Sequence, residues 1–187
     1  MEITNSLLVA MMFIVLLTMG IGNIVIFLAT IVDKKTPIKT DLIHISWVVL
    51  LLLVYFNMFW HVLDILTVEE WSFFEFLYIV AGAIIVFFAS QILLPDSSRP
   101  EVNNLREHYF GICRQFFFFL AILQVWIIGV DFVLRKGFTT PGIFNVIGLF
   151  LFISLSSSGS ARLHSIGTLL AWILYMGLSL LKSIGFF

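Results

Sequence analysis

Polar residues recur at helical spacing within one apolar stretch of the chain. Asn57, His61 and Asp64 fall at positions i, i+4 and i+7, so a helix would place them on one face. The next apolar stretch carries Glu75, and the connection is short, so we expect antiparallel neighbours that bring His61 and Glu75 close together. Histidine changes charge near neutral pH, and a carboxylate stabilises its charged form. This pattern predicts a proton- or cation-responsive site; the alternative is a satisfied structural pair between two helices.

An amide further along the chain extends this candidate site. Gln124 lies in a later apolar stretch, where an amide serves either helix packing or the lining of a pore, and Asn145 allows the same two interpretations. The candidate residues for an ion or proton site are Glu75, His61, Asp64, Asn57 and Gln124. His61, Asp64 and Glu75 are also candidate ligands for a divalent metal, although we expect no cofactor.

Two of the four histidines could hold a haem iron. His44 and His164 stand at the starts of different apolar stretches and could face each other across a helical bundle, as two axial ligands must. The alternative is that each is a polar residue at the level of lipid headgroups. No GxSxG, HExxH or phosphate-loop motif is present, so we expect no enzymatic activity.

A polar segment between two apolar stretches is the candidate partner-binding surface. It reads LREHYF over residues 105–110, and Arg106, His108 and Tyr109 are its candidate contact residues. Asn104 and Glu107 form a candidate helix cap, so we expect a short interfacial helix in the loop of residues 95–110. This loop is too small for a catalytic domain.

The composition indicates the class of protein that positions these residues. Of 187 residues, 61% are hydrophobic and 11% are charged, whereas a typical soluble domain is about half apolar and about a quarter charged. Ten Lys and Arg against eleven Asp and Glu leave a net charge of −1, which excludes an electrostatic nucleic-acid binder. The single cysteine, Cys113, excludes an internal disulfide framework. The composition predicts an all-α membrane protein with one transmembrane domain over residues 1–187.

Six apolar stretches are predicted to span the lipid bilayer. A helix needs about 20 apolar residues to cross a hydrocarbon core of about 30 Å. The predicted spans are residues 7–32, 42–63, 70–94, 111–134, 141–155 and 163–184. The fifth is short, so five spans with a re-entrant segment remain the alternative. Thr67 and Glu70 form a candidate capping box before the third span, Pro95 ends that span, and Pro141 suits the first turn of the fifth.

The distribution of Lys and Arg predicts the orientation. With the N-terminus outside, the basic residues of the inner loops are Lys34, Lys35, Lys39, Arg99, Arg106, Arg114 and Arg162. Those outside are Arg135, Lys136 and Lys182. Basic loops stay on the cytoplasmic side of a membrane, so both termini are predicted to lie outside.

Two segments carry a resemblance to other proteins. They are ASQILLPD (Ala89–Asp96) and LREHYF (Leu105–Phe110). This pair resembles a pattern in uncharacterised small multi-pass membrane proteins of bacteria, and the similarity reaches back through the second predicted span. The resemblance implies a bacterial inner-membrane protein and brings no activity and no site residues with it.

Two functions from different classes fit these features. The first is a subunit of an ion or proton channel or transporter, homo-oligomeric because one six-helix bundle leaves little room for a lumen. The alternative is a scaffold or sensor that recruits a partner protein through the cytoplasmic loop of residues 95–110. A membrane redox subunit with haem or a metal is a third, and nucleic acid is a partner in none of them.

Overall fold

The computed structural model describes residues 5–32, 38–95, 104–133 and 141–183. Within these ranges the regular elements are helices, and the β pairing is confined to an isolated bridge between Lys39 and Asn104. The helices are α1 (Asn5–Val32), α2 (Leu42–Trp60), α3 (Val62–Leu66), α4 (Phe73–Leu93), α5 (Leu105–Val133), α6 (Pro141–Ser156) and α7 (Ala161–Ser183). The predicted all-α architecture is confirmed.

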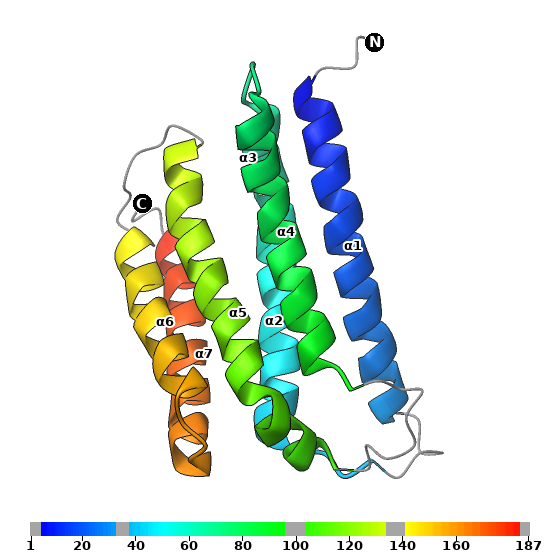
Figure 1. The fold of residues 1–187 in the computed structure, drawn as a ribbon, viewed down its shortest axis with the longest axis vertical. Coiled ribbons are helices and arrows are strands. Elements are labelled where there is room, and N and C mark those ends of the chain that lie inside the picture. The colour runs from blue at the N-terminus through cyan, green and yellow to red at the C-terminus, as the bar shows by residue number, and fades with distance from the viewer. Residues whose placement is uncertain (1–4, 33–37, 96–103, 134–140, 184–187) are drawn as a thin grey trace.

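The helices form a bundle in which α2 is the central member. The long helices run along one axis and alternate in direction (Figure 1). α2 contacts α1, α4, α5 and α7, while α5 lies between α4 and α6. One end of the bundle carries α3, and we call it the α3 end. The opposite end carries Asp41, whose carboxylate caps α2 by accepting hydrogen bonds from two backbone N–H groups, and we call it the Asp41 end.

Four of the described helical segments are long and apolar enough to cross a membrane. They are α1, the segment Leu42–Leu66 formed by α2 and α3, α4, and Leu105–Val130 of α5. The described part of α6, Ile143–Ser156, is a shorter apolar helix. Val32, Leu42 and Phe74 are 79%, 83% and 82% exposed, and such an apolar outer surface suits hydrocarbon rather than water. These are the features of a multi-pass membrane protein, while six spans and two outward termini stay predictions.

The turn between α3 and α4 differs from the prediction. The sequence predicts Thr67 with Glu70 as the capping box, but the helix continues to Leu66 and Thr67 closes α3 with a helical φ of −82° and ψ of −11°. An N-cap residue needs an extended backbone. Ser72 has one, with φ −78° and ψ 156°, and forms the capping box with Glu75. The chain contains this pattern twice, and the second copy is the one that starts a helix.

α5 is one unbroken helix and includes the segment that the sequence assigns to a separate interfacial helix. The predicted cap is confirmed, because Asn104 Nδ2 donates to Glu107 Oε1 at 2.8 Å and Asn104 Oδ1 accepts from Arg106 N at 3.2 Å. The helix then passes through Gly111 without a break. Its 29 residues span about 43 Å at about 1.5 Å per residue, so α5 exceeds a hydrocarbon core of about 30 Å.

Two aromatic side chains lie against two glycines where α4 and α5 pack together. Trp126 on α5 lies against Gly82 on α4, and the Tyr78 hydroxyl on α4 lies against Gly129 on α5, so that a Cβ atom at either glycine would overlap the ring or its hydroxyl. Trp126 Nε1 donates a hydrogen bond to Tyr78 O at 2.6 Å, and Tyr78 Oη donates one to Trp126 O at 3.0 Å. We call these four residues the α4–α5 lock.

A third ring joins α1, α2 and α4. Tyr55 on α2 lies against Gly20 on α1, where a Cβ atom would overlap the phenol ring. The Tyr55 hydroxyl lies 3.1 Å from Ser90 Oγ on α4, and Ser90 Oγ donates its own hydrogen to Phe87 O at 2.7 Å. Tyr55 is therefore the donor to Ser90. Small residues allow such close approach of helices, and a buried hydroxyl needs a partner within the protein because lipid offers none.

Gly82→Ala is expected to lower the free energy of unfolding by about 1–3 kcal/mol, because the added methyl group displaces the Trp126 ring. Gly22→Ala on α1 is the matched control, since none of the described atoms outside its own helix lies within 4 Å of a Cβ built at Gly22. Thermal unfolding of the purified protein in detergent measures both changes. Equal melting temperatures for the two variants would contradict the role of the α4–α5 lock.

Candidate functional site

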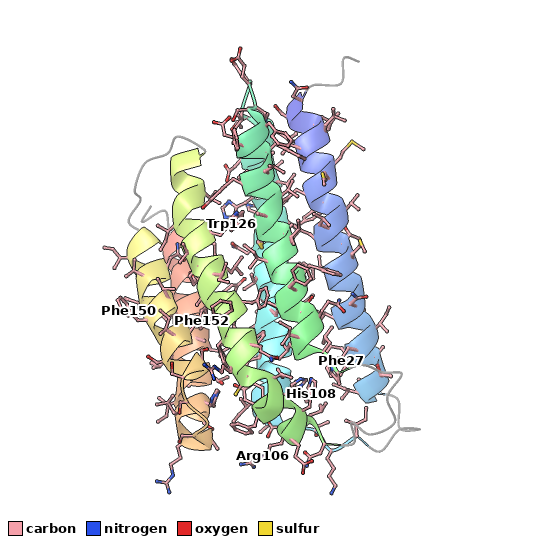
Figure 2. The ribbon with its side chains drawn as sticks, in the orientation of Figure 1. Phe27, Arg106, His108, Trp126, Phe150 and Phe152 are labelled. Atoms are coloured by element: carbon pink, nitrogen blue, oxygen red, sulfur yellow. The ribbon has the colours of Figure 1, made fainter. Side chains whose placement is uncertain are left out.

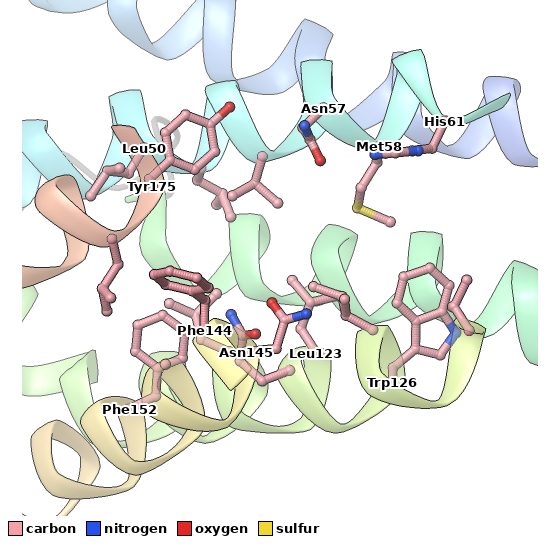
Figure 3. Close-up of a pocket in the computed structure, with 18 of the residues that line it drawn as sticks. Leu50, Asn57, Met58, His61, Leu123, Trp126, Phe144, Asn145, Phe152 and Tyr175 are labelled. Carbon is pink, nitrogen blue, oxygen red and sulfur yellow. The ribbon is translucent and has the colours of Figure 1, made fainter. Parts of the chain in front are cut away.

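A cavity of about 330 Å³ lies between α2, α5, α6 and α7 and reaches the α3 end of the bundle. Most of its lining is apolar, and its polar side chains are Asn57, His61, Asp64, Gln124, Asn145, Tyr175 and Ser179. Asn57 on α2 and Asn145 on α6 lie on facing walls (Figure 3). Four of the five residues predicted for an ion or proton site therefore line one cavity, and Glu75 is the exception.

His61 and Asp64 form a hydrogen-bonded pair at the α3 end of this cavity. Nδ1 of His61 lies 2.8 Å from Oδ2 of Asp64, and the two side chains are 46% and 33% exposed. The pair forms where the helix is interrupted, because His61 separates α2 from α3 with φ −74° and ψ 0°. This partial exposure makes the pair accessible from the α3 end.

Glu75 stabilises the start of α4. Its Oε2 accepts a hydrogen bond from Ser72 N at 2.8 Å, and its own N–H donates to Ser72 Oγ at 3.2 Å. The carboxylate thus satisfies a backbone donor that a helix start leaves unpaired. Among the described residues no three His, Cys, Asp or Glu side chains gather into a possible metal site. The predicted ligand set of His61, Asp64 and Glu75 does not come together.

Gln124 brings an unsatisfied hydrogen-bond acceptor to the cavity. Its Oε1 atom is buried and accepts no hydrogen bond from the described part of the chain. Gly148 on α6 lies beside this amide, and a Cβ atom there would be in van der Waals contact with it, 3.4 Å from Gln124 Cδ. A buried acceptor without a partner costs about 1–3 kcal/mol. A bound molecule that carries a hydrogen-bond donor would recover this cost.

Aromatic rings close the cavity toward the Asp41 end. Trp47 on α2 and Phe152 on α6 line the cavity, and both pack against Phe117 on α5 with ring centroids 4.9 Å and 6.2 Å away. Trp47 Nε1 is held by Thr168 Oγ1, to which it donates at 2.9 Å. In the described ranges the cavity therefore has an aromatic floor and does not continue as a pore to the other end.

Three helix ends meet at the carbonyl of Leu93, near the Asp41 end. Leu93 is the last residue of α4, and its oxygen lies 2.9 Å from His44 Nε2 and 3.2 Å from His108 Nε2. His44 stands near the start of α2 and His108 near the start of α5. The last carbonyls of a helix have no partner within it and are often satisfied by side chains. The two histidines thus cap α4.

His164 is held nearby by two hydrogen bonds. Its Nδ1 lies 2.8 Å from Tyr109 Oη and its Nε2 lies 2.8 Å from Ser158 O. The Tyr109 ring packs against both imidazoles, with centroids 6.3 Å from His44 and 5.4 Å from His164. An axial ligand must offer the iron a ring nitrogen, and both nitrogens of His164 are engaged. This arrangement does not support the predicted haem between His44 and His164.

The predicted partner-binding residues separate into one surface residue and two internal ones. Arg106 and His108 lie at the Asp41 end (Figure 2), and Arg106 is exposed. Tyr109 is fully buried, and His108 is half-buried against Leu93. Their burial follows from the continuity of α5, which turns one face of the LREHYF segment into the bundle. Tyr109 is therefore not part of a partner-binding surface, contrary to the prediction.

Sequence reasoning missed the aromatic residues of the cavity wall, two of which form hydrogen bonds between helices. Trp126 belongs to the α4–α5 lock, and Tyr175 on α7 donates its hydroxyl to Leu53 O on α2 at 2.9 Å. A signal was available, because a Trp or Tyr inside an apolar stretch must find a partner for its N–H or O–H. The sequence does not say which helix supplies that partner.

No family model matches this chain, and no curated protein and no solved structure matches it either. The resemblance of residues 89–96 and 105–110 to bacterial membrane proteins therefore assigns no function to the chain. The functional conclusion depends on the geometry of the cavity.

Tyr109→Phe is expected to lower the free energy of unfolding by about 1–3 kcal/mol, because it leaves Nδ1 of the buried His164 without its partner. Ser165→Ala is the matched loss of a hydroxyl, since Ser165 is exposed on α7 and donates to Ala161 O within its own helix. Its expected effect is within about 0.5 kcal/mol. Thermal unfolding in detergent compares the two, and an effect of Tyr109→Phe as small as that of Ser165→Ala would contradict this assignment.

Proposed function

We propose that the protein transports protons or other cations across a membrane and binds them in the cavity between α2, α5, α6 and α7. The observation that carries this proposal is a cavity lined by amides and a hydrogen-bonded His–Asp pair, inside helices of which several are long enough to cross a membrane. Polar and ionisable groups are costly within a bilayer and commonly mark the paths of ions there. The amides of Asn57, Gln124 and Asn145 offer oxygen atoms in place of the water that a cation gives up.

The shape of the cavity supports a carrier rather than an open pore. The pair of His61 and Asp64 is partly exposed at the α3 end, whereas Trp47, Phe117 and Phe152 close the floor. A cation that enters from the α3 end can leave at the other end only if this floor opens. Alternation between two conformations around a central binding site is the usual solution in membrane transporters.

Asp64 and His61 have separate roles in this proposal. The Asp64 carboxylate supplies the negative charge that attracts a cation. His61 Nδ1 lies 2.8 Å from Asp64 Oδ2, so a cation that binds Asp64 must share or displace this contact. The homo-oligomer is a separate prediction that this proposal does not use.

Asp64→Asn is expected to lower cation flux into proteoliposomes at least about tenfold, because the neutral amide removes a charged partner worth about 1.5–3 kcal/mol. Glu70→Gln is the matched control, since Glu70 is an exposed carboxylate in the turn after α3 and does not line the cavity. The measurement is the flux of protons and of potassium, with size-exclusion chromatography to establish folding. Folded wild-type protein that passes neither ion, or an equal loss in both variants, would count against the proposal.

A further inference from the structure

We propose that the preferred ligand of the cavity is a small organic amine, with a protonated primary amino group on an apolar body. This inference rests on the proposed function in one respect: it assigns a chemical class to the cation that the same cavity takes. The ammonium group would lie beside Gln124 Oε1, and the apolar body would point toward the floor at Trp47 and Phe152.

The apolar part of the cavity determines the body of the ligand. Between the amides and the floor the lining is aromatic and aliphatic, with Phe144, Phe152 and Tyr175 among its residues (Figure 3). A volume of about 330 Å³ lies at the lower end of the usual range for small-molecule pockets, about 300–1,000 Å³. An inorganic cation would leave this apolar volume without contacts, whereas a hydrocarbon or aromatic group would fill it.

The charge of the lining determines the sign of the ligand. Among the described residues that line the cavity, Asp64 is the only carboxylate and none is Lys or Arg. Among the described lining residues the one basic group is His61, and it shares a contact with Asp64. The lining is therefore negative or neutral and never positive, which disfavours an anion. A cation is attracted by the carboxylate of Asp64.

The unsatisfied acceptor determines the head group. Gln124 Oε1 needs a hydrogen-bond donor, and the carbonyl oxygens of Asn57 and Asn145 line the same cavity. A primary ammonium group carries three N–H donors and no acceptor, as in lysine. A quaternary ammonium group has the charge without a donor, and an alcohol has a donor without the charge. The primary amine is the class that matches both features of the site.

Isothermal titration of the full chain in detergent tests this inference with three probes of similar shape. They are 2-phenylethylamine, its N,N,N-trimethyl derivative and 2-phenylethanol. We expect the primary amine to bind at least about tenfold more tightly than the other two, because only it donates a charged hydrogen bond to Gln124. Equal affinities for the three probes would overturn the inference.

Variants at Gln124 show whether this amide causes the preference for a primary amino group. Gln124→Leu is expected to abolish the preference for the amine over the alcohol, while Gln124→Glu, which keeps the shape and adds a carboxylate, is expected to increase it. Gln91→Leu is the matched control, because Gln91 is an exposed amide on α4 that does not line the cavity. An unchanged preference in both Gln124 variants, or the same loss in Gln91→Leu, would overturn the assignment.

The two proposals fail in different ways. Amine binding without flux of protons or potassium would support the inference and count against the proposed ion transport. Flux of those ions with no binding of 2-phenylethylamine would support transport and overturn the inference.

Discussion

Three aromatic side chains in this bundle lie directly against glycines of neighbouring helices, and each of them donates a hydrogen bond to another helix. Lipid chains are as apolar as the side chains they touch, so helices in a membrane associate through close packing and internal hydrogen bonds. Gly82 and Gly129 permit the α4–α5 lock, and Gly20 permits the contact with Tyr55. Because Trp126 belongs both to the lock and to the cavity lining, this packing also holds one wall of the candidate site.

The polar groups at the two ends of the bundle differ in their hydrogen-bond partners. Near the Asp41 end the imidazoles of His44 and His108 cap Leu93, and His164 bonds both Tyr109 and Ser158. The chain itself supplies a hydrogen-bond partner to each of these rings, although Nδ1 of His44 is buried without one among the described residues. In the cavity Gln124 Oε1 has no partner among the described residues, and the pair of His61 and Asp64 is partly exposed at the α3 end. A ligand is the natural complement of the second arrangement.

Sequence periodicity predicted helix content, the cap at Asn104 and the shared face of Asn57, His61 and Asp64, because these depend on neighbours within a few positions. It misplaced the capping box, since T-x-x-E and S-x-x-E are equivalent as patterns and only the length of the preceding helix decides between them. It also left the roles of His164 and Tyr109 open. Their bond joins residues far apart in the chain, and helical spacing contains no information on which helices become neighbours.

The carbonyl of Leu93 determines which ring nitrogen carries the hydrogen in two histidines. A carbonyl oxygen can only accept, so each imidazole that bonds to it must carry a hydrogen on Nε2. Neutral His44 and neutral His108 are therefore both the Nε2–H tautomer, although they belong to different helices. The bare Nδ1 of His44 is buried and has no hydrogen-bond partner in the described part of the chain. One carbonyl at the end of α4 thus selects the tautomer of two histidines, a property that ¹⁵N chemical shifts report directly.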